Sequence, residues 1–296
     1  MRKDLLLIYN PAAGKSGAVS SLSNMIRVFA QSNCRVVVYP ILEGHGAEEI
    51  LAEEGDRFDY VVCCGGDGTL NHTVNALMAL PKERRPLLGY VPTGSTNDFA
   101  NFMGIAKSVI KNCRNIVRNE PFFYDVGSFN GKYFNYVAAF GAFTEVAYST
   151  NQDLKNLLGH SAYIMEAIRT RPFGMKYSMR ARANGRTFEG DYLFCSVTDS
   201  STVGGINIPM LGNTVRDDGL FEVTMIKSPP SLLEYQNLFQ GLLIEGFKSP
   251  YLELFQTDSI SFEFDEPVAW TLDGEFGGKN DKVEIKVHNK AIGLVR

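Results

Sequence analysis

A glycine-rich turn at positions 65–69, Gly-Gly-Asp-Gly-Thr, lies between an apolar run and a helical pattern. Glycine lets the backbone pass close to a ligand and adopt positive φ angles, and the N–H groups at the start of a helix bind phosphate. A carboxylate among such groups repels phosphate unless a divalent cation lies between them, so Asp67 indicates a Mg²⁺-dependent nucleotide site. The alternative is a tight turn in which Asp67 caps the helix.

Polar residues also follow two other apolar runs. Asn10 and Pro11 come directly after the first run, and the segment 92–98 follows the fourth. In an open parallel sheet, ligands bind outside the carboxyl ends of the strands, so we expect these segments to lie at one edge of a sheet. The glycine pattern matches neither the Rossmann G-x-G-x-x-G sequence nor the G-x-x-x-x-G-K-[ST] loop.

Glu275 follows Asp273 and Gly274 at the end of a strand-like run, where a turn would present its carboxylate. A carboxylate within about 3 Å of an aliphatic hydroxyl can act as its general base, because that hydroxyl is too weak an acid to ionise by itself. The alternative is that Asp273 and Gly274 simply form a two-residue type I′ hairpin turn.

The first 120 residues alternate short apolar runs with helical patterns, which is typical of a parallel sheet with crossover helices. The predicted strands are 4–9, 35–39, 60–64 and 87–91, and the predicted helices are 18–32, 48–54 and 69–80. Lysines and arginines spaced by 4, 3 and 4 residues between 107 and 118 indicate a further helix.

After Pro121 the pattern changes to hairpins. Asn130-Gly131 separates the strand-like runs 125–129 and 132–140, and Asn184-Gly185 separates 176–183 from 186–197. Further predicted strands are 220–226, 259–264, 268–272, 283–288 and 291–295, with a helix at about 231–247. The fold class predicted is α/β + β: an N-terminal three-layer parallel-sheet nucleotide domain and a C-terminal mainly antiparallel β-sandwich domain.

Composition excludes several classes of protein. The net charge of -4 argues against a nucleic-acid-binding protein, and no apolar run approaches the roughly 20 residues of a spanning helix. The five cysteines show no C-x-x-C spacing, so we expect reduced, mostly buried thiols and a cytoplasmic location. The segment 169–186 carries six cations and no acid, which suits either an anionic membrane surface or an edge strand protected by charge.

Four motifs resemble the bacterial soluble lipid kinases of the diacylglycerol kinase catalytic-domain family. They are Asn10-Pro11 to Lys15, Gly-Gly-Asp-Gly-Thr with Asn71 after it, Pro-Thr-Gly-Ser-Thr-Asn-Asp-Phe-Ala at 92–100, and Thr-Leu-Asp-Gly-Glu at 271–275. The resemblance runs in order along nearly the whole chain. It implies an ATP-binding domain at 1–121, to which the segment 287–296 returns, a lipid-substrate domain at 122–286, and catalysis in a cleft between them.

The resemblance also implies roles for individual residues. The ATP site would be lined by Asn10, Gly66, Asp67, Gly68, Thr69, Leu70, Asn71, His72 and Ser95. Asp67, Asp98 and Asp125 would support a water-linked Mg²⁺ network, with Glu275 as the general base. A structural Mg²⁺ would be held by the Asp218 carboxylate and the carbonyls of Val215 and Leu220.

The function expected from the resemblance is transfer of the γ-phosphate of ATP to a lipid hydroxyl. The expected partners are ATP and a lipid presented at a membrane surface, without nucleic acid and compatible with a homodimer. The protein would be cytoplasmic and transiently associated with the inner face of the membrane. Two alternatives stay open: a kinase acting on a soluble nucleotide such as NAD, and a non-catalytic nucleotide- or lipid-binding regulator.

Overall fold

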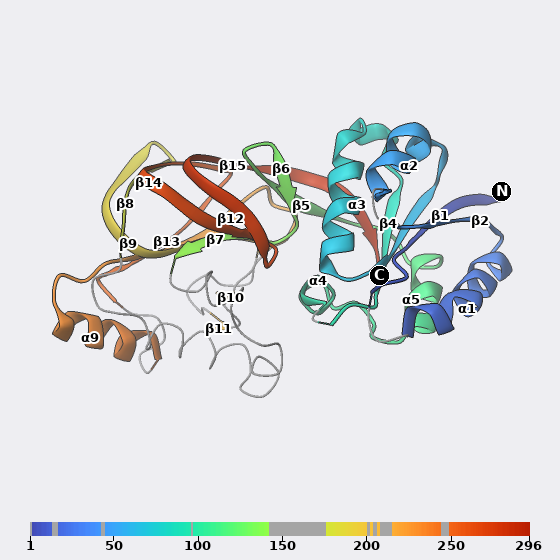
Figure 1. Cartoon of the computed structure of the whole chain (residues 1–296), viewed down its shortest axis with the longest axis horizontal. Helices are drawn as coiled ribbons and strands as arrows, with labels where there is room; N and C mark the ends of the chain where they lie inside the picture. The colour runs from blue at the N-terminus through green and yellow to red at the C-terminus, as the bar shows by residue number, and fades with distance from the viewer. Residues whose placement is uncertain are drawn as a thin grey trace. The chain divides into compact units, whose positions relative to one another are not determined.

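The computed structural model describes residues 2–13, 17–42, 45–95, 97–141, 176–199, 202–203, 206–207, 215–243 and 249–296 (Figure 1). The chain forms two compact units. The first contains Met1–Val126, Lys132–Asn135 and His288–Arg296, and the second contains Gly127–Gly131 and Tyr136–Val287. Among the described residues, no helix is long and apolar enough to cross a membrane.

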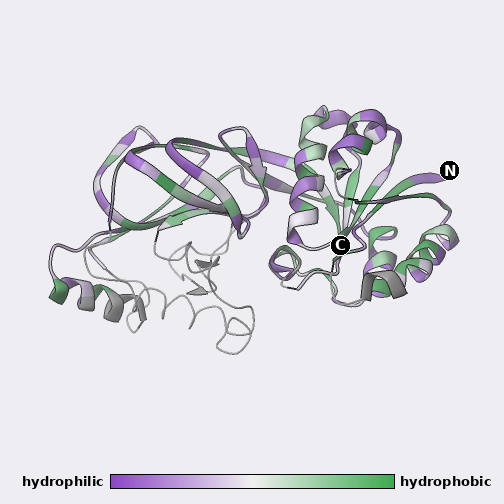
Figure 2. Ribbon diagram, in the orientation of Figure 1, coloured by the Kyte–Doolittle hydropathy of each residue, from purple (hydrophilic) through white to green (hydrophobic). Residues whose placement is uncertain are grey.

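A parallel sheet forms the centre of the first unit, with the strand order β15-β4-β3-β1-β2. Its strands are β1 (Lys3–Tyr9), β2 (Cys34–Pro40), β3 (Tyr60–Gly65), β4 (Leu87–Pro92) and the end of β15 (Glu275–Val295). The strands β1, β3 and β4 consist largely of consecutive buried apolar residues, as expected for strands that are covered on both faces (Figure 2).

Helices cover both faces of this sheet (Figure 1). They are α1 (Gly17–Gln31), α2 (Ala47–Glu54), α3 (Asp67–Ala79), α4 (Asp98–Phe102) and α5 (Val109–Ile116), with short 3₁₀ turns η1 (Gly55–Arg57) and η2 (Lys82–Arg84). Helices α1 and α5 pack together through Met25, Phe29, Cys113 and Ile116, while α2 packs beside α3. The α/β architecture predicted for this part of the chain is therefore confirmed.

The helix predicted at 69–80 begins two residues earlier, at Asp67. Asp67, Gly68 and Thr69 thus all belong to the first turn of α3. The sequence did not predict the helix α4, which begins at Asp98, the last residue of the polar segment 92–98.

The second unit is mainly antiparallel, which confirms the predicted β-rich part of the fold class. Its strands include the end of β5 (Phe122–Phe129), β7 (Val137–Gly141), β8 (Tyr177–Ala183), β9 (Arg186–Thr198), β12 (Phe221–Lys227), β13 (Leu252–Thr257), β14 (Ser259–Leu272) and most of β15. The short strand β6 (Lys132–Phe134), which pairs with β5, lies in the first unit. Two short strands, β10 (Thr202–Val203) and β11 (Ile206–Asn207), and the helix α9 (Leu232–Leu243) complete the described elements.

Two long strands organise this unit. Both β9 and β14 pair with β8 at one end and with β7 at the other. The space between the strands is filled by aromatic rings: Trp270 lies 4.8 Å from Phe140 and 5.0 Å from Phe129 between ring centroids, and Phe140 lies 5.0 Å from Phe264. Edge-to-face contacts of this kind add to the burial of the rings themselves.

All three predicted two-residue turns form. The φ angles are 47° and 85° at Asn130-Gly131, 52° and 70° at Asn184-Gly185, and 50° and 87° at Asp273-Gly274. Positive φ at both positions is the signature of a type I′ turn, which asparagine, aspartate and glycine tolerate best.

Several predicted strand limits were wrong. The runs 259–264 and 268–272 are one strand, β14, with an irregularity between Glu263 and Val268, and the runs 283–288 and 291–295 both belong to β15. The run 132–140 instead breaks into β6 and β7 at Asn135 and Tyr136. The strand β13 was missed, and residues 244–247 of the helix predicted at 231–247 lie outside the described part of the chain.

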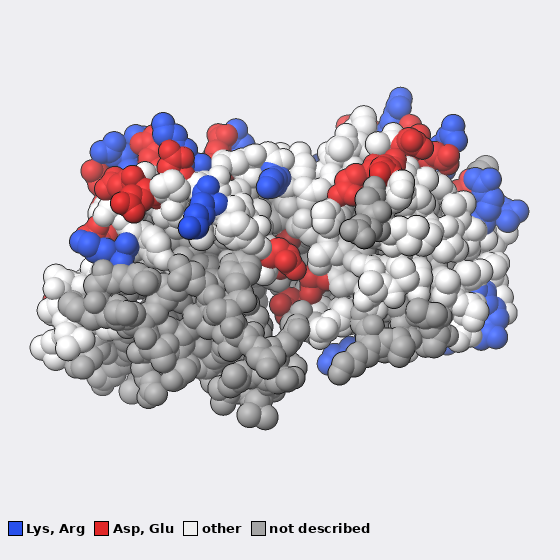
Figure 3. All heavy atoms as spheres, in the orientation of Figure 1, with Lys and Arg blue, Asp and Glu red and all other residues white. Residues whose placement is uncertain are grey.

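The described cations of the segment 169–186 are largely paired with acids, and residues 169–175 lie outside the described residues. Lys176 contacts Asp191 at 2.5 Å, Arg180 contacts Glu189 at 3.1 Å and Arg182 contacts Glu263 at 3.4 Å. Figure 3 shows this mixture of charges on the drawn face of the second unit. The edge-strand interpretation was wrong, because β8 is paired with β9 and β14 on its two sides.

A buried carboxyl in the second unit makes stability depend on pH. Glu222 is 1% exposed, and burial raises its pKa to about 7, although Gln256 Nε2 donates a hydrogen bond to its Oε1 atom. Between the ordinary glutamate pKa and about pH 7, the unfolded chain loses this proton while the folded chain keeps it. The free energy of unfolding should therefore fall by roughly 3 kcal/mol over that range because of Glu222.

Urea unfolding of wild type and Glu222→Gln at pH 5 and pH 7.5 measures this contribution. We expect wild type to lose stability relative to Glu222→Gln on going to pH 7.5. An equal pH dependence in both proteins would contradict the assignment.

Candidate active site

Three polar segments meet at the carboxyl edge of the parallel sheet. The Asn10 N–H donates to the Cys64 carbonyl at 3.0 Å, and the Thr93 N–H donates to the Gly65 carbonyl at 2.9 Å. The Asn10 side chain also reaches α3, where its Nδ2 donates to Thr69 Oγ1 at 3.0 Å. The convergence expected from the strand order is therefore present in the first unit.

Two glycines let these segments approach closely. An ideal Cβ on Gly94 would lie 2.6 Å from the Gly66 Cα, and one on Gly65 would lie 2.5 Å from the Thr69 Cβ. Helix α3 begins after Gly66 without a side-chain cap, and its first helical bond runs from the Leu70 N–H to the Gly66 carbonyl. The start of α3 thus has the backbone form of a phosphate-binding site.

The carboxylate of Asp67 caps a neighbouring helix. Its Oδ2 accepts from the Asp98 N–H at 3.0 Å, and its Oδ1 accepts from the Phe99 N–H at 3.2 Å. The expected alternative, a cap on its own helix, was wrong: the helix that Asp67 caps is α4. Asp98, the first residue of α4, is therefore held directly beside Asp67.

The loop before α4 closes on itself. Asn97 has a φ of 52°, and its side chain accepts from the Gly94 N–H at 2.9 Å and donates to the Gly94 carbonyl at 2.8 Å. Ser95 lies at the exposed tip of this loop. Its hydroxyl is thus available to a ligand at the same edge as α3.

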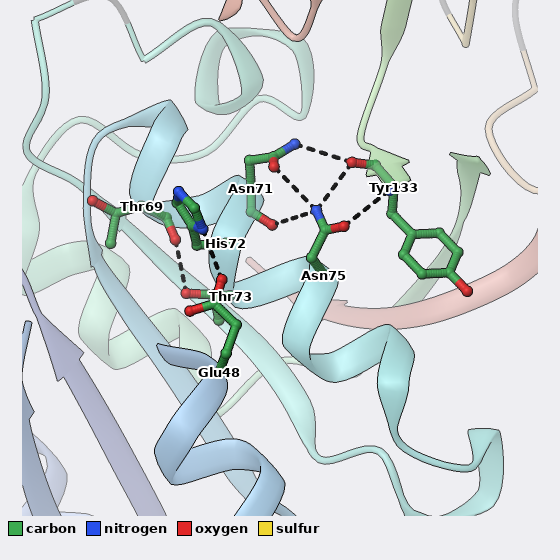
Figure 4. Close-up of polar contacts among 7 residues, drawn as sticks. All are labelled: Glu48, Thr69, Asn71, His72, Thr73, Asn75 and Tyr133. Carbon is green, nitrogen blue, oxygen red and sulfur yellow. Dashed lines mark hydrogen bonds and ion pairs between the residues drawn. The ribbon is translucent and has the colours of Figure 1, made fainter. Parts of the chain in front are cut away.

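Two residues expected to line the ATP site contact other parts of the first unit (Figure 4). His72 Nδ1 lies 2.7 Å from Glu48 Oε1 on α2, and Asn71 Nδ2 donates to the Tyr133 carbonyl at 3.2 Å. Leu70 is fully buried in the core, and Thr69 is 8% exposed. Leu70 therefore faces the core, Asn71 contacts Tyr133, and His72 is exposed beside Glu48. The backbone of the first turn, rather than these side chains, has the form of a phosphate site.

A residue that the motifs did not mark, Asn75, completes the contact with Tyr133. Its Nδ2 donates to the Tyr133 carbonyl at 3.0 Å and its Oδ1 accepts from the Tyr133 N–H at 2.9 Å (Figure 4). The only sequence signal is the spacing of four residues from Asn71, which places the two amides on one helix face.

Asp125 is fully buried on β5. Its Oδ1 accepts from Asn289 Nδ2 at 3.0 Å and from the Lys290 N–H at 2.6 Å, both on β15. Asn289 and Lys290 were not expected at the site. Nothing in the sequence brings them to Asp125, because the link is made by a strand 164 residues further along the chain.

Glu275 and its turn belong to the second unit. Glu275 is exposed, whereas Asp273 is 5% exposed and its Oδ1 accepts from the N–H groups of Tyr136 and Val137 at 3.0 and 3.3 Å. The Asp273 N–H donates in turn to the Val137 carbonyl at 2.9 Å. The hairpin turn and the presentation of Glu275 are therefore compatible: the turn holds Asp273 inside and leaves Glu275 outside.

The residues expected to hold a structural Mg²⁺ also lie in the second unit. Asp218 is exposed and its Oδ1 accepts from the Leu220 N–H at 2.9 Å, while Val215 is 48% exposed. Across the described residues, no group of three or more histidine, cysteine or acidic side chains could hold a metal ion. Mg²⁺ commonly binds through one or two carboxylates together with substrate phosphates, so a Mg²⁺ near Asp67 would not require such a group.

The donor set of the first unit fits such a cation. A carboxylate oxygen has two lone pairs, so Asp67 can accept the N–H bonds from α4 and a metal-bound water together. Burial raises the pKa of the adjacent Cys64 thiol to about 11. All five cysteines are free and buried, as predicted.

Comparison with known proteins agrees with these motifs. Residues 4–129 match the diacylglycerol kinase catalytic domain. A diacylglycerol kinase of Bacillus subtilis is 28% identical over 278 residues, which cover 92% of this chain and 89% of that protein. One of Staphylococcus carnosus is 27% identical over 281 residues, covering 94% and 90%. Over nearly its whole length this chain is therefore similar to bacterial proteins named diacylglycerol kinase.

Solved structures of a diacylglycerol kinase and of an NAD kinase have the same overall fold as this chain. The crystal structure of a diacylglycerol kinase from Bacillus anthracis has a TM-score of 0.77 at 23% identity and covers 99% of this chain and 96% of that one. An NAD kinase from Archaeoglobus fulgidus, solved in complex with ATP, has a TM-score of 0.55 at 12% identity, covering 99% and 93%. The fold by itself thus does not distinguish a lipid kinase from a kinase for a soluble nucleotide.

The close approach of Gly94 and Gly66 predicts different effects for alanine at the two positions. A methyl group on Gly94 would meet the Gly66 backbone at 2.6 Å, whereas one on Gly66 would lie 3.3 Å from the Gly94 Cα. Overpacking of this kind costs about 1–3 kcal/mol, so Gly94→Ala should lose more nucleotide affinity than Gly66→Ala.

Calorimetric titration with a non-hydrolysable ATP analogue and Mg²⁺ measures the affinities. Lys107→Ala, an exposed substitution outside the loop, serves as the control and should bind like wild type. Wild-type affinity in Gly94→Ala would show that the two loops do not form the nucleotide site.

Proposed function

We propose that this chain is an ATP-dependent lipid kinase that transfers the γ-phosphate of ATP to the hydroxyl of diacylglycerol or a related lipid. The observation that carries the proposal is the junction of Gly66, Asp67 and Gly94, where an uncapped helix start meets two carboxylates. Its place in the diacylglycerol kinase catalytic domain supports the same chemistry.

In this proposal the backbone at the start of α3 and the side chains of Asn10 and Ser95 bind ATP. Asp67, Asp98 and Asp125 hold a water-linked Mg²⁺, which when bound neutralises charge on the phosphates. The hydrogen bonds to Asp67 and Asp125 support these roles, because they fix the direction of each carboxylate before any ligand binds.

Glu275 would act as the general base. It would take the proton of the lipid hydroxyl as the oxygen attacks the γ-phosphorus, and the products would be ADP and a phosphorylated lipid. Exposure of Glu275 on a turn held by Asp273 supports this role, since a base must reach an acceptor that enters from outside the protein.

The proposal extends to the surroundings of the enzyme. Because acceptors of this class reside in membranes, the lipid would be presented at a membrane surface with which a cytoplasmic enzyme associates transiently. A second Mg²⁺ bound by Asp218 and the carbonyls of Val215 and Leu220 would have a structural role, supported by the compact turn that ends at Leu220.

The proposal is tested with the full-length protein, ATP labelled at the γ-phosphate and Mg²⁺. Diacylglycerol, phosphatidylglycerol, a sphingoid base and an isoprenoid alcohol are offered in mixed micelles, and NAD is offered in solution. We expect label in a lipid product. Label in NAD alone would support the soluble-nucleotide kinase, and the absence of transfer to every acceptor would support a binding protein.

Glu275→Gln tests the role of the base. General base catalysis contributes roughly 10²–10⁴-fold, so kcat should fall at least 100-fold while nucleotide affinity and the melting temperature stay unchanged. Glu284→Gln, an exposed glutamate on the same strand, is the matched control and should retain activity. Undiminished turnover by Glu275→Gln would remove Glu275 from the mechanism.

A further inference from the structure

Five consecutive residues, Tyr133–Val137, are held by hydrogen bonds at both ends, and we call this segment the strap. It runs from β6 across the break at Asn135 and Tyr136 into β7. Tyr133 to Asn135 belong to the first unit, and Tyr136 and Val137 belong to the second. The contacts at each end lie within one unit.

Helix α3 holds the first end through backbone atoms. Asn75 both accepts from the Tyr133 N–H and donates to the Tyr133 carbonyl, the pair of bonds that a residue on a neighbouring strand would make (Figure 4). Asn75 Nδ2 also lies 3.0 Å from Asn71 Oδ1, and Asn71 Nδ2 donates to the same carbonyl. These bonds fix the orientation of both amides and commit Asn71 to the strap.

The Asp273 turn holds the other end. The Asp273 carboxylate accepts from the N–H groups of Tyr136 and Val137, and the Asp273 N–H donates to the Val137 carbonyl. The Tyr136 carbonyl is also occupied, because it accepts from Thr198 Oγ1 at 2.7 Å. Both ends of the strap are therefore bound through main-chain atoms. Any residue except proline would keep these N–H and carbonyl groups.

The strap is short. Only four peptide units separate Tyr133 from Val137, so a disturbance at the first end has a short path along the chain to the second. One end is bound by the helix whose first turn carries Asp67, and the other by the residue two positions before Glu275.

We propose that Asn75 and Asp273 are positioning residues that hold the two ends of one strap, and that the order they impose on the strap extends along the chain to the turn that presents Glu275. The inference rests on the proposed function for the roles of Glu275 and α3. A displacement of about 1 Å can cost 10²-fold in rate, so a restraint of this kind acts on kcat. Neither residue touches a reacting atom in this scheme.

The test uses substitutions that release one end at a time. Asn75→Ala removes the first grip. Asp273→Gly removes the second without backbone strain, because glycine tolerates the φ of 50°, whereas Asp273→Asn keeps both the φ and the oxygen acceptor. We expect Asn75→Ala and Asp273→Gly each to lower kcat 10- to 100-fold with nucleotide affinity within about twofold of wild type, and Asp273→Asn to restore most of the rate.

The double variant Asn75→Ala with Asp273→Gly separates a shared strap from two independent effects. Two grips on one segment are coupled, so the double variant should fall no more than about threefold below the slower single variant. A loss equal to the product of the single losses overturns the proposal. So does a loss in Asp273→Asn as large as in Asp273→Gly, which would make the charge of Asp273 the active feature.

Hydrogen–deuterium exchange gives a readout that does not depend on activity. In Asn75→Ala the amide of Asp273, which donates to the strap at its other end, should exchange at least tenfold faster than in wild type. Unchanged exchange at Asp273 overturns the strap, even if the protein phosphorylates no lipid. A wild-type enzyme that is inactive with every acceptor while exchange still spreads from Asn75 to Asp273 would instead contradict the proposed function alone.

Discussion

The approach of two backbones at Gly66 and Gly94 is the constraint on which the first unit depends. Because β3 and β4 are parallel neighbours, the segments that follow them begin at the same edge of the sheet. These two segments are so close that a methyl group does not fit between them. Only that proximity allows the carboxylate of Asp67 to reach the N–H groups of α4. The order of the strands thus determines where the acids of the site lie.

Asp67 links folding to chemistry. Its hydrogen bonds to Asp98 and Phe99 stabilise a five-residue helix that has no side-chain cap of its own at Asn97. The same bonds orient the carboxylate, so no rotamer freedom is lost when a cation binds. Substitution of Asp67 cannot separate stability from its proposed role in binding Mg²⁺, because removing the carboxylate also removes the hydrogen bonds that hold the start of α4.

Hydrophobic periodicity predicted the sheet and the long helices, and Asn-Gly and Asp-Gly pairs predicted the turns, because these signals lie within a few residues of one another. The missed features depend on partners that are remote in the sequence. Helix α4 begins where a residue 31 positions earlier caps it, and Arg182 is neutralised by an acid 81 positions later. Asn75 binds main-chain atoms of Tyr133, and those atoms are the same whatever residue stands there.

In the turn at Asp273-Gly274-Glu275, one residue is exposed and its near neighbour is held in place. In the proposed mechanism Glu275 meets a lipid and must therefore be exposed, and an exposed side chain that follows a two-residue turn has little to fix its position. The buried side chain of Asp273 supplies that restraint, because its Oδ1 accepts hydrogen bonds from the N–H groups of Tyr136 and Val137 and is shielded there from water. Because Glu275 is only two residues further on, order imposed on Asp273 is passed to it through the backbone. An exposed reactive residue can therefore be positioned by a buried neighbour without losing access to its substrate.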